Sequence, residues 1–173
     1  IRSPRWKPSE LLPMNTVPAD TGKQVRPLYL LADIGGTNAR FAFTDPVNTA
    51  PEPIANYAVE EFPSFEEVLN QLRQDWQALN LSNTYLARVC LAVAAIPEQR
   101  EISFTNNPWR FTAEGVAEQM MCPHISIIND FAAVARALPA LSAEHLEAIG
   151  GGEVEQYKPM VAIGPGTGTG VAS

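Results

Sequence analysis

Hydrophobic positions along this chain fall into short apolar runs, each ended by Gly, Pro, Asn or Asp. Runs of this kind predict buried strands. The first three follow one another closely, and consecutive strands joined by short connections usually pair, so we expect an antiparallel meander there. The expected strands are Leu28–Ala32, Arg40–Thr44, Ile54–Val59, Arg88–Ile96, Ile102–Phe104, Ile125–Ile128 and Met160–Gly164.

Helical periodicity begins after Ser64, which forms a capping box with Glu67. The apolar residues that share one helical face there are Phe65, Val68, Leu69, Leu72, Trp76 and Leu79. Further helices are expected over Thr112–Met121, Phe131–Leu138 and Ser142–Ile149. Strands that alternate with helices in this way predict an α/β protein, with a mixed sheet flanked by helices.

The composition is that of a globular protein. Of the 173 residues, 46% are hydrophobic and 18% are charged, which excludes the disordered and membrane classes. The net charge of -7 repels nucleic acid and anionic membranes, so neither is an expected partner. Cys90 and Cys122 form no metal or disulfide pattern, and no secretory signal is visible, so we expect a cytoplasmic protein.

Two changes in composition divide the chain. Residues 1–27 are rich in Pro, Ser and Arg and predict a disordered leader, and Pro139-Ala140-Leu141 has the character of a hinge. We therefore expect one small domain over 28–140 and the incomplete start of a larger domain over 141–173.

The first candidate site is the turn Asp33-Ile34-Gly35-Gly36-Thr37-Asn38. Glycines let backbone N–H groups approach a ligand closely, and successive N–H groups form a nest for anions. Thr37 and Asn38 add side-chain donors. Asp33 would repel a phosphate directly, so its place there is explained if Mg²⁺ or its water shell lies between them. A plain β-hairpin with a Gly-Gly turn is the alternative.

The second candidate is the turn Gly164-Pro165-Gly166-Thr167-Gly168-Thr169-Gly170, which follows an apolar strand. It lacks the lysine of a P-loop and the third glycine of a dinucleotide-binding fingerprint, so both of those assignments are weak. A second phosphate-binding turn and a flexible hairpin remain as the two interpretations.

The third candidate is Asn129-Asp130, where a buried strand ends and a helix begins. Ligand-binding groups of open α/β sheets gather at such strand ends. An ionised Asp130 can accept a hydroxyl proton, and Asn129 can bind a sugar hydroxyl. On the sequence alone, however, a helix N-cap is the favoured role of Asp130. Together the three sites indicate phosphoryl transfer, which depends mostly on positioning and charge neutralisation.

These motifs, in this order, resemble those of the bacterial glucokinase family. Leu31–Arg40 is similar to its first phosphate motif, Gly164–Gly170 to its second, and Ile127–Val134 to its sugar-site segment. Phe104-Thr105-Asn106-Asn107-Pro108-Trp109 resembles its Thr-Asn-x-x-Trp stretch. The resemblance extends from about Leu28 to the end of the chain.

The resemblance implies the actin-like sugar-kinase fold, with two ribonuclease H-like domains, and the phosphorylation of glucose by ATP at the 6-hydroxyl. It implies that Asp130 is the catalytic base, that Asn129 and Asn106 bind the sugar, and that Asp33 holds Mg²⁺ through water. The residues implied to hold the ATP phosphates are Gly35, Gly36, Thr37, Asn38, Gly166, Thr167 and Gly168. Family members are about twice as long as this chain, with further sugar and adenosine segments beyond Ser173, so we expect the isolated 173 residues to be inactive.

Three alternatives stay open at this point. The same fold can phosphorylate another hexose, because much of the sugar specificity lies outside this segment. A sugar-responsive regulator on this fold is a second alternative, although residues 1–27 are too short and Pro-rich for a helix-turn-helix. The third is an interaction domain whose glycine turns have no ligand. A homodimer is an assembly that the sequence leaves open.

Overall fold

The structure is a computed structural model that describes residues 25–47, 50–79, 81, 83–151, 158–165 and 169–173. The leader expected over 1–27 lies outside these residues except for its last three positions. Two of those positions already belong to the first strand, which begins at Arg26 rather than at Leu28. Among the described residues, no helix is long and apolar enough to cross a membrane.

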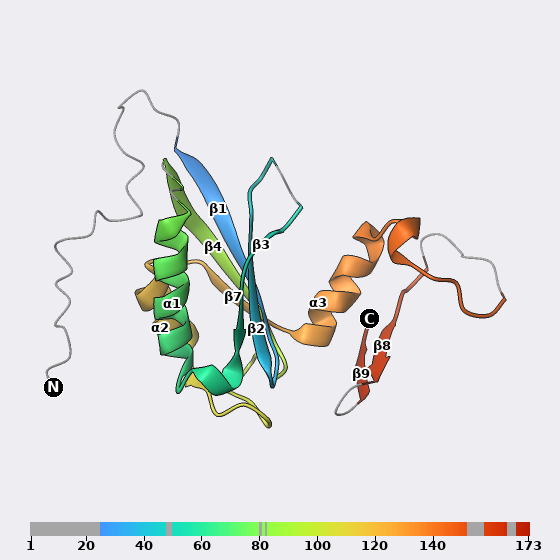
Figure 1. Cartoon of the computed structure of the whole chain (residues 1–173). Coiled ribbons are helices and arrows are strands. Elements are labelled where there is room, and N and C mark those ends of the chain that lie inside the picture. The colour runs from blue at the N-terminus through green and yellow to red at the C-terminus, as the bar shows by residue number, and fades with distance from the viewer. Residues whose placement is uncertain (1–24, 48–49, 80, 82, 152–157, 166–168) are drawn as a thin grey trace, which may run out of the picture.

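A five-stranded mixed sheet forms the centre of the fold (Figure 1). Its strand order is β3-β2-β1-β4-β7, with antiparallel pairing among β1, β2 and β3 and parallel pairing of β1 with β4 and of β4 with β7. The strands are β1 Arg26–Ile34, β2 Asn38–Thr44, β3 Glu52–Ala58, β4 Thr84–Val93 and β7 Ile125–Asn129. The predicted α/β class and the predicted meander are both confirmed.

Helices cover one face of this sheet (Figure 1). Helices α1 Phe65–Ala78 and α2 Ala113–Met120 lie on that face, whereas α3 Asp130–Ala137 follows the end of β7 and extends away from the sheet, with its contacts mainly to the last two strands of the chain. Both predicted caps of the first two helices are confirmed, because Ser64 Oγ accepts from Glu67 N at 3.3 Å and Thr112 Oγ1 accepts from Gly115 N at 3.0 Å. Each bond satisfies an amide that the first helical turn leaves free.

The hydrophobic core lies between the sheet and the α1–α2 layer. Every second residue of β1 faces it, as the period of a half-buried strand requires. Trp109 is only 1% exposed, and its Nε1 donates to the Phe62 carbonyl at 2.9 Å. Other buried members of the core are Leu30, Ile34, Phe41, Phe65, Leu69, Leu72, Leu91 and Val93.

Trp109 is held in the core by a short hairpin that the sequence pattern predicted only in part. Strand β5 is Ile102–Ser103, one residue shorter than expected, and it pairs with β6, Arg110–Phe111, which was not predicted. The Phe111 ring packs on Phe65 with ring centroids 4.3 Å apart. The loop between β5 and β6 therefore returns across the core to the edge of the sheet.

The region after α3 contains one wrong prediction. The helix expected over Ser142–Ile149 is only a 3-10 turn, Ala143–His145, preceded by another at Leu138–Ala140. Ile149 is 96% exposed and Leu146 is 59% exposed, so no neighbouring surface stabilises an apolar helical face. The Ser142 hydroxyl donates to Glu144 Oε1 at 2.9 Å, a local bond that competes with a longer helix.

The described chain ends in a two-stranded hairpin beside α3 (Figure 1). Strand β8, Ala162–Pro165, pairs antiparallel with β9, Thr169–Ala172. The predicted strand–turn–strand unit at the second glycine motif is therefore confirmed. A further 3-10 turn, Val59–Glu61, connects β3 toward α1.

The two cysteines are free thiols that differ in burial. Cys90 is half-buried on β4, whereas Cys122 belongs to the core. Burial raises the pKa of both thiols, against smaller opposing effects of Arg136 on Cys90 and of the His124 backbone on Cys122. A raised pKa keeps a thiol protonated and poorly nucleophilic, so neither cysteine is suited to catalysis.

A hydrogen-bonded tyrosine joins β3 to α1 and makes the stability of the fold sensitive to alkaline pH. The Tyr57 hydroxyl donates to Asp75 Oδ2 at 2.6 Å. Burial, followed by this bond and the charge of Asp75, raises the pKa of Tyr57. A raised pKa in the folded state means that the contribution to stability is complete below the unfolded pKa of about 10 and is lost as the pH rises further.

We predict that Tyr57→Phe lowers the free energy of unfolding by about 1 kcal/mol at pH 7, because a partly exposed hydrogen bond to a carboxylate is lost. The difference from the wild type should shrink above about pH 10. Urea unfolding of the full-length protein at several pH values measures it, with Tyr85→Phe on β4 as the matched control. Identical pH profiles for the two variants would contradict the prediction.

Candidate active site

The carboxyl ends of three parallel strands meet at one edge of the sheet. Neighbouring strands lie about 4.8 Å apart, so the segments that follow β1, β4 and β7 are brought within reach of a single ligand. A cavity of about 750 Å³ opens at this edge. Its lining residues are Gly36, Thr37, Ala94, Ala95, Ile96, Phe104, Thr105, Asn106, Asn129, Asp130, Phe131, Gly170 and Val171.

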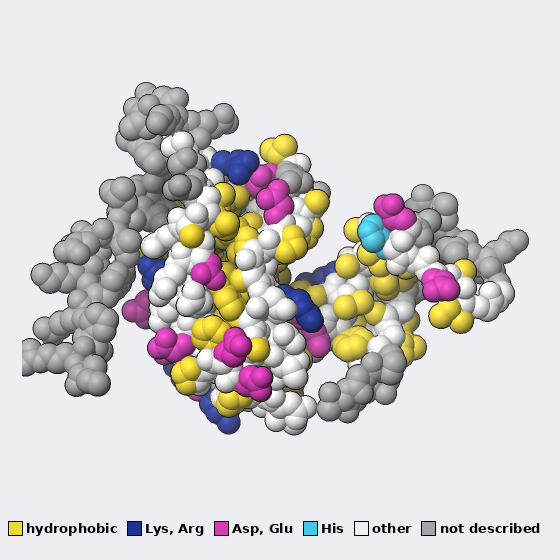
Figure 2. Space-filling model, in the orientation of Figure 1, with side chains coloured by type: hydrophobic (Ala, Val, Ile, Leu, Met, Phe, Trp, Pro, Cys, Tyr) yellow, Lys and Arg dark blue, Asp and Glu magenta, His cyan; other side chains and the backbone are white. Residues whose placement is uncertain are grey.

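The cavity combines residues from all three predicted motifs and from the Thr-Asn-x-x-Trp stretch. Asn106, Asn129 and Asp130 line it together with Gly36 and Thr37 of the first glycine turn. In the space-filling view, a notch separates the sheet body from the part that carries α3 and the β8–β9 hairpin (Figure 2). A volume of this size suits a small-molecule ligand.

In the first glycine turn, most carbonyl groups are engaged, and the two central amides have no partner among the described residues. The carbonyls of Ile34, Gly35 and Thr37 all accept hydrogen bonds from outside the turn. The donors are Ala94 N at 3.1 Å, Asn107 Nδ2 at 3.1 Å and Val59 N at 2.9 Å. Within the described part of the chain, the amides of Gly36 and Thr37 donate to no partner. Free amides beside engaged carbonyls are the arrangement that an anion nest requires.

Glycine at position 36 lets the turn lie close to the neighbouring loop. A Cβ at this position would lie 3.2 Å from Asn106 Cβ and 3.5 Å from the Asn106 carbonyl oxygen. At Gly35, the nearest atom to a Cβ would be 3.7 Å away, an ordinary contact. The glycine at 36 therefore brings the phosphate-type turn against the predicted sugar contact Asn106.

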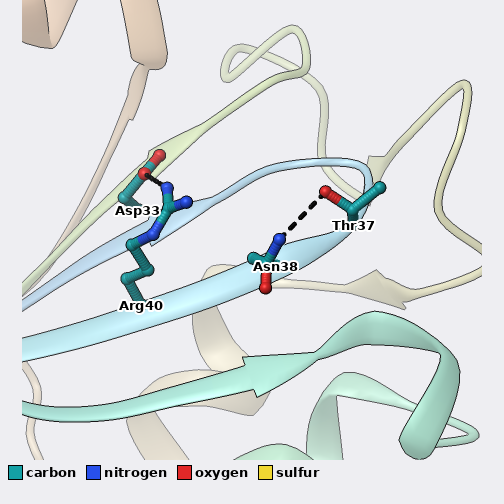
Figure 3. A network of polar contacts seen from close by, with 4 residues as sticks. All are labelled: Asp33, Thr37, Asn38 and Arg40. Atoms are coloured by element: carbon teal, nitrogen blue, oxygen red, sulfur yellow. Dashed lines mark hydrogen bonds and ion pairs between the residues drawn. The ribbon is translucent and has the colours of Figure 1, made fainter.

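Asp33 lies on the other side of this turn from the large cavity. Its carboxylate is exposed, and Oδ2 lies 2.9 Å from Arg40 Nη1, its cross-strand neighbour on β2 (Figure 3). Asp33 and Arg40 border a separate shallow cavity, whereas Asp130 borders the 750 Å³ cavity. The structure thus gives Asp33 a basic partner that the sequence did not predict. An exposed ion pair of this kind contributes little free energy, so Asp33 can leave it for another partner.

The side chains of Thr37 and Asn38 contact each other at the tip of the same turn (Figure 3). Asn38 Nδ2 donates to Thr37 Oγ1 at 3.1 Å. This bond leaves the Thr37 hydroxyl hydrogen available to an acceptor such as a phosphate oxygen.

The predicted cap of α3 was assigned to the wrong residue. Asn129, not Asp130, is the N-cap: Asn129 Oδ1 accepts from Phe131 N at 3.0 Å and from Ala132 N at 3.2 Å. Asn129 Nδ2 also donates to the Ala95 carbonyl at 3.4 Å. Asp130 is the first helical residue, and its Oδ1 accepts from Phe131 N at 2.9 Å.

Because Asn129 is the cap, helix capping does not explain why an aspartate stands at position 130. A carboxylate in the first turn is favoured by the helix dipole, and here it borders the cavity rather than closing the helix. Asn129, in contrast, uses both ends of its amide for structure, and only its remaining donor and acceptor capacity is available to a ligand.

Asn107 is a residue beside the candidate site whose structural contacts sequence reasoning missed. It is 5% exposed, its Nδ2 donates to the Gly35 carbonyl, and its Oδ1 accepts from Trp109 N at 2.8 Å. The side chain therefore connects the core tryptophan to the first glycine turn. Its place beside Asn106 in the quoted motif was the one available signal, because a contact across 72 residues is not visible in local patterns.

The structure describes only part of the second glycine turn. Gly170 and Val171 line the cavity, so the β8–β9 hairpin reaches the same site as the first turn. Gly166, Thr167 and Gly168, which were predicted to hold phosphate, lie outside the described residues. Among the described residues, no group of three or more His, Cys, Asp or Glu side chains is arranged to hold a metal ion.

The mixed sheet, its flanking helices and the site at the carboxyl ends of its parallel strands define an actin-like sugar kinase fold. A glucokinase from an Antarctic psychrotroph superposes with a TM-score of 0.65 at 31% identity, covering 83% of this chain and 45% of that protein. A glucokinase of the ROK family from Streptomyces griseus, in complex with glucose and AMPPNP, gives 0.55 at 17% identity, covering 83% of this chain and 43% of that protein, and supports the fold alone.

The sequence comparisons give the family. The glucokinase family model matches residues 30–173. The glucokinase of Colwellia psychrerythraea is 39% identical over 146 residues, and that of Salmonella schwarzengrund is 36% identical over 143 residues. These matches cover 84% and 83% of this chain and 43% of each relative. The chain belongs to the glucokinase family, and it spans less than half the length of the curated relatives it matches.

We predict that Asn107→Ala destabilises the protein by about 2 kcal/mol, because it leaves the buried amide of Trp109 and the Gly35 carbonyl without their partners. The first glycine turn should loosen, so the KM for ATP should rise in the full-length protein. Thermal melting and steady-state kinetics measure the two effects. Asn56→Ala, at an exposed position of β3, is the matched control, and equal behaviour of the two variants would contradict the role of Asn107.

Proposed function

We propose that the full-length protein carrying this chain is a glucokinase that transfers the γ-phosphate of ATP to the 6-hydroxyl of glucose. The observation that carries the proposal is that one cavity joins Asp130 and Asn106 to the free amides of the first glycine turn. A base and an anion nest facing the same space are what phosphoryl transfer to an alcohol requires. The glucokinase names of the relatives support glucose as the hexose.

Asp130 is the proposed catalytic base. Because Asn129 caps α3, the carboxylate of Asp130 is not needed to close the helix and remains at the border of the cavity. In this role it accepts the proton of the hexose 6-hydroxyl as the oxygen attacks phosphorus. Asn106 and the remaining polar capacity of Asn129 orient the sugar from either side of Asp130.

The proposed ATP site begins at the first glycine turn. The amides of Gly36 and Thr37 and the Thr37 hydroxyl donate to phosphate oxygens, with Gly35 and Asn38 shaping the turn. The β8–β9 hairpin, with Gly166, Thr167 and Gly168 between its strands, is the proposed second phosphate site. The AMPPNP complex of the Streptomyces griseus glucokinase is consistent with a nucleotide on this fold.

Asp33 is the proposed Mg²⁺-holding residue, through water. Mg²⁺ keeps several waters and commonly uses only one or two carboxylates together with substrate phosphates, so a single exposed carboxylate beside a phosphate turn fits it. The ion would neutralise phosphate charge. Arg40 neutralises Asp33 in the structure and is exposed enough to release it.

The division into a small domain over 28–140 and the start of a second over 141–173 is part of the same proposal. The 3-10 turn Leu138–Ala140 marks the proposed boundary. The inactivity expected of the isolated 173 residues also stays a prediction, because sugar and adenosine groups supplied by other segments would be missing from the cavity.

We predict that Asp130→Asn in the full-length protein lowers kcat for glucose phosphorylation by roughly 10²- to 10⁴-fold, because general base catalysis is lost. The KM for ATP should change little. A coupled assay of glucose 6-phosphate formation measures both values. Glu98→Gln, at an exposed loop position, is the matched control with wild-type rates. An unchanged rate for Asp130→Asn would point instead to another base or to the interaction domain.

We predict that Asp33→Asn raises the Mg²⁺ concentration needed for half-maximal rate by several-fold, since an amide holds a hydrated cation less well than a carboxylate does. The rate should recover in part at high Mg²⁺. Titration of the full-length enzyme with MgCl₂ at saturating ATP and glucose measures this. Glu114→Gln, an exposed acid on α2, serves as the control, and an unshifted Mg²⁺ curve for Asp33→Asn would remove Asp33 from this role.

A further inference from the structure

The residue after Asp130 contacts the β8–β9 hairpin in an unusual way. The Phe131 ring lies against Gly164 of β8 and Gly170 of β9, which are directly paired across the hairpin. A Cβ at Gly164 would lie 2.6 Å from Phe131 Cζ, and a Cβ at Gly170 would lie 1.9 Å from Phe131 Cε2. Both values are shorter than any contact a real side chain makes, so the ring occupies the space of two side chains.

The pairing of the two glycines explains why one ring can cover both. Directly opposed residues of an antiparallel pair present their side chains on the same face, about 5 Å apart. With no Cβ at either position, this pair leaves a flat area of backbone that a single aromatic ring spans. A side chain at either position would have to displace the Phe131 ring or move the hairpin away from α3.

The other end of the contact is fixed to the helix start. Phe131 N donates to Asn129 Oδ1, the cap of α3, so the backbone that carries the ring is held in the same hydrogen-bonded turn as Asp130. Asp130, Phe131 and Gly170 all line the large cavity. The ring therefore lies between the start of α3, which carries the proposed base, and the β8–β9 hairpin beside it.

We propose that Phe131 is a positioning residue that sets the distance between Asp130 and the β8–β9 hairpin, with Gly164 and Gly170 as the flat surface it requires. The proposal rests on the phosphoryl transfer proposed above. The contact on which it depends involves only described residues of the hairpin, Gly164 and Gly170. Displacement of the hairpin would misplace bound ATP relative to the attacking hydroxyl, and an error of about 1 Å in such geometry can cost roughly 100-fold in rate.

The test is a double-mutant cycle in the full-length protein with Gly170→Ala, Phe131→Ala and the combined variant. Gly170→Ala alone should lower kcat/KM for ATP by roughly 10- to 100-fold, with the KM for glucose changed less than twofold. In the Phe131→Ala background, where the ring is absent, the same glycine change should cost less than about twofold. Non-additivity of this kind reports direct contact.

Two controls keep the result interpretable. Gly151→Ala, where a Cβ would meet nothing within 4 Å, should behave as wild type in both backgrounds. Phe131→Leu retains apolar volume and should fall between Phe131→Ala and the wild type, and it replaces Phe131→Ala in the cycle if that variant melts too low to assay.

The outcomes separate this inference from the proposed function. Equal cost of Gly170→Ala in both backgrounds, or a lowered melting temperature with kcat and KM unchanged, overturns the positioning role while leaving glucose phosphorylation intact. A wild-type protein without hexose-dependent ATP turnover overturns the proposed function and the positioning role with it.

Discussion

The site depends on the parallel pairing of β1, β4 and β7. Parallel strands end at the same edge of a sheet, so the pairing of the strands alone brings three segments distant in sequence together. Asp33 pairs with Ala92, and Ala92 pairs with Ile128, which places the ends of β1 and β7 about 10 Å apart across one intervening strand. A ligand that spans this distance can contact the glycine turn and the start of α3 together.

The proposed binding of ATP at this edge would have to overcome the charge of the chain. The net charge of -7 opposes an anion at long range, and the cation beside the described glycine turn, Arg40, is already paired with Asp33. The groups of the turn itself are three carbonyls engaged by the surrounding protein and two amides with no described partner. Preorganised dipoles of this kind stabilise charge without reorganisation, so the proposed phosphate site needs few charged groups.

The sequence predicted the elements whose signals are local and missed those that depend on distant contacts. The strand at Leu28–Ala32 and the cap at Ser64 were correct because an apolar run and capping chemistry lie within a few residues. The wrong helix after Ser142 had a suitable pattern, yet its apolar residues have no described surface to cover. The hydrogen bond from Asn107 to the Gly35 carbonyl joins positions 72 residues apart, so the local sequence around either residue does not predict it. Cavity residues Asn106 and Asp130 were found through motif order, although their roles remain proposals.

Three consecutive residues at the start of α3 make three different kinds of contact. Because they are adjacent, these contacts together hold the start of the helix in place. Asn129 closes the helix, Asp130 borders the cavity and Phe131 packs on paired glycines of the hairpin. The Asp130 carboxylate also accepts from Phe131 N at 2.9 Å, so one of its oxygens is bonded to the first turn of the helix. With the cap one residue earlier and the ring one residue later, the residues on both sides of the carboxylate contact different elements. For the proposed base, attachment from both sides keeps the carboxylate in place while substrates enter and leave, which is the property that positional catalysis demands.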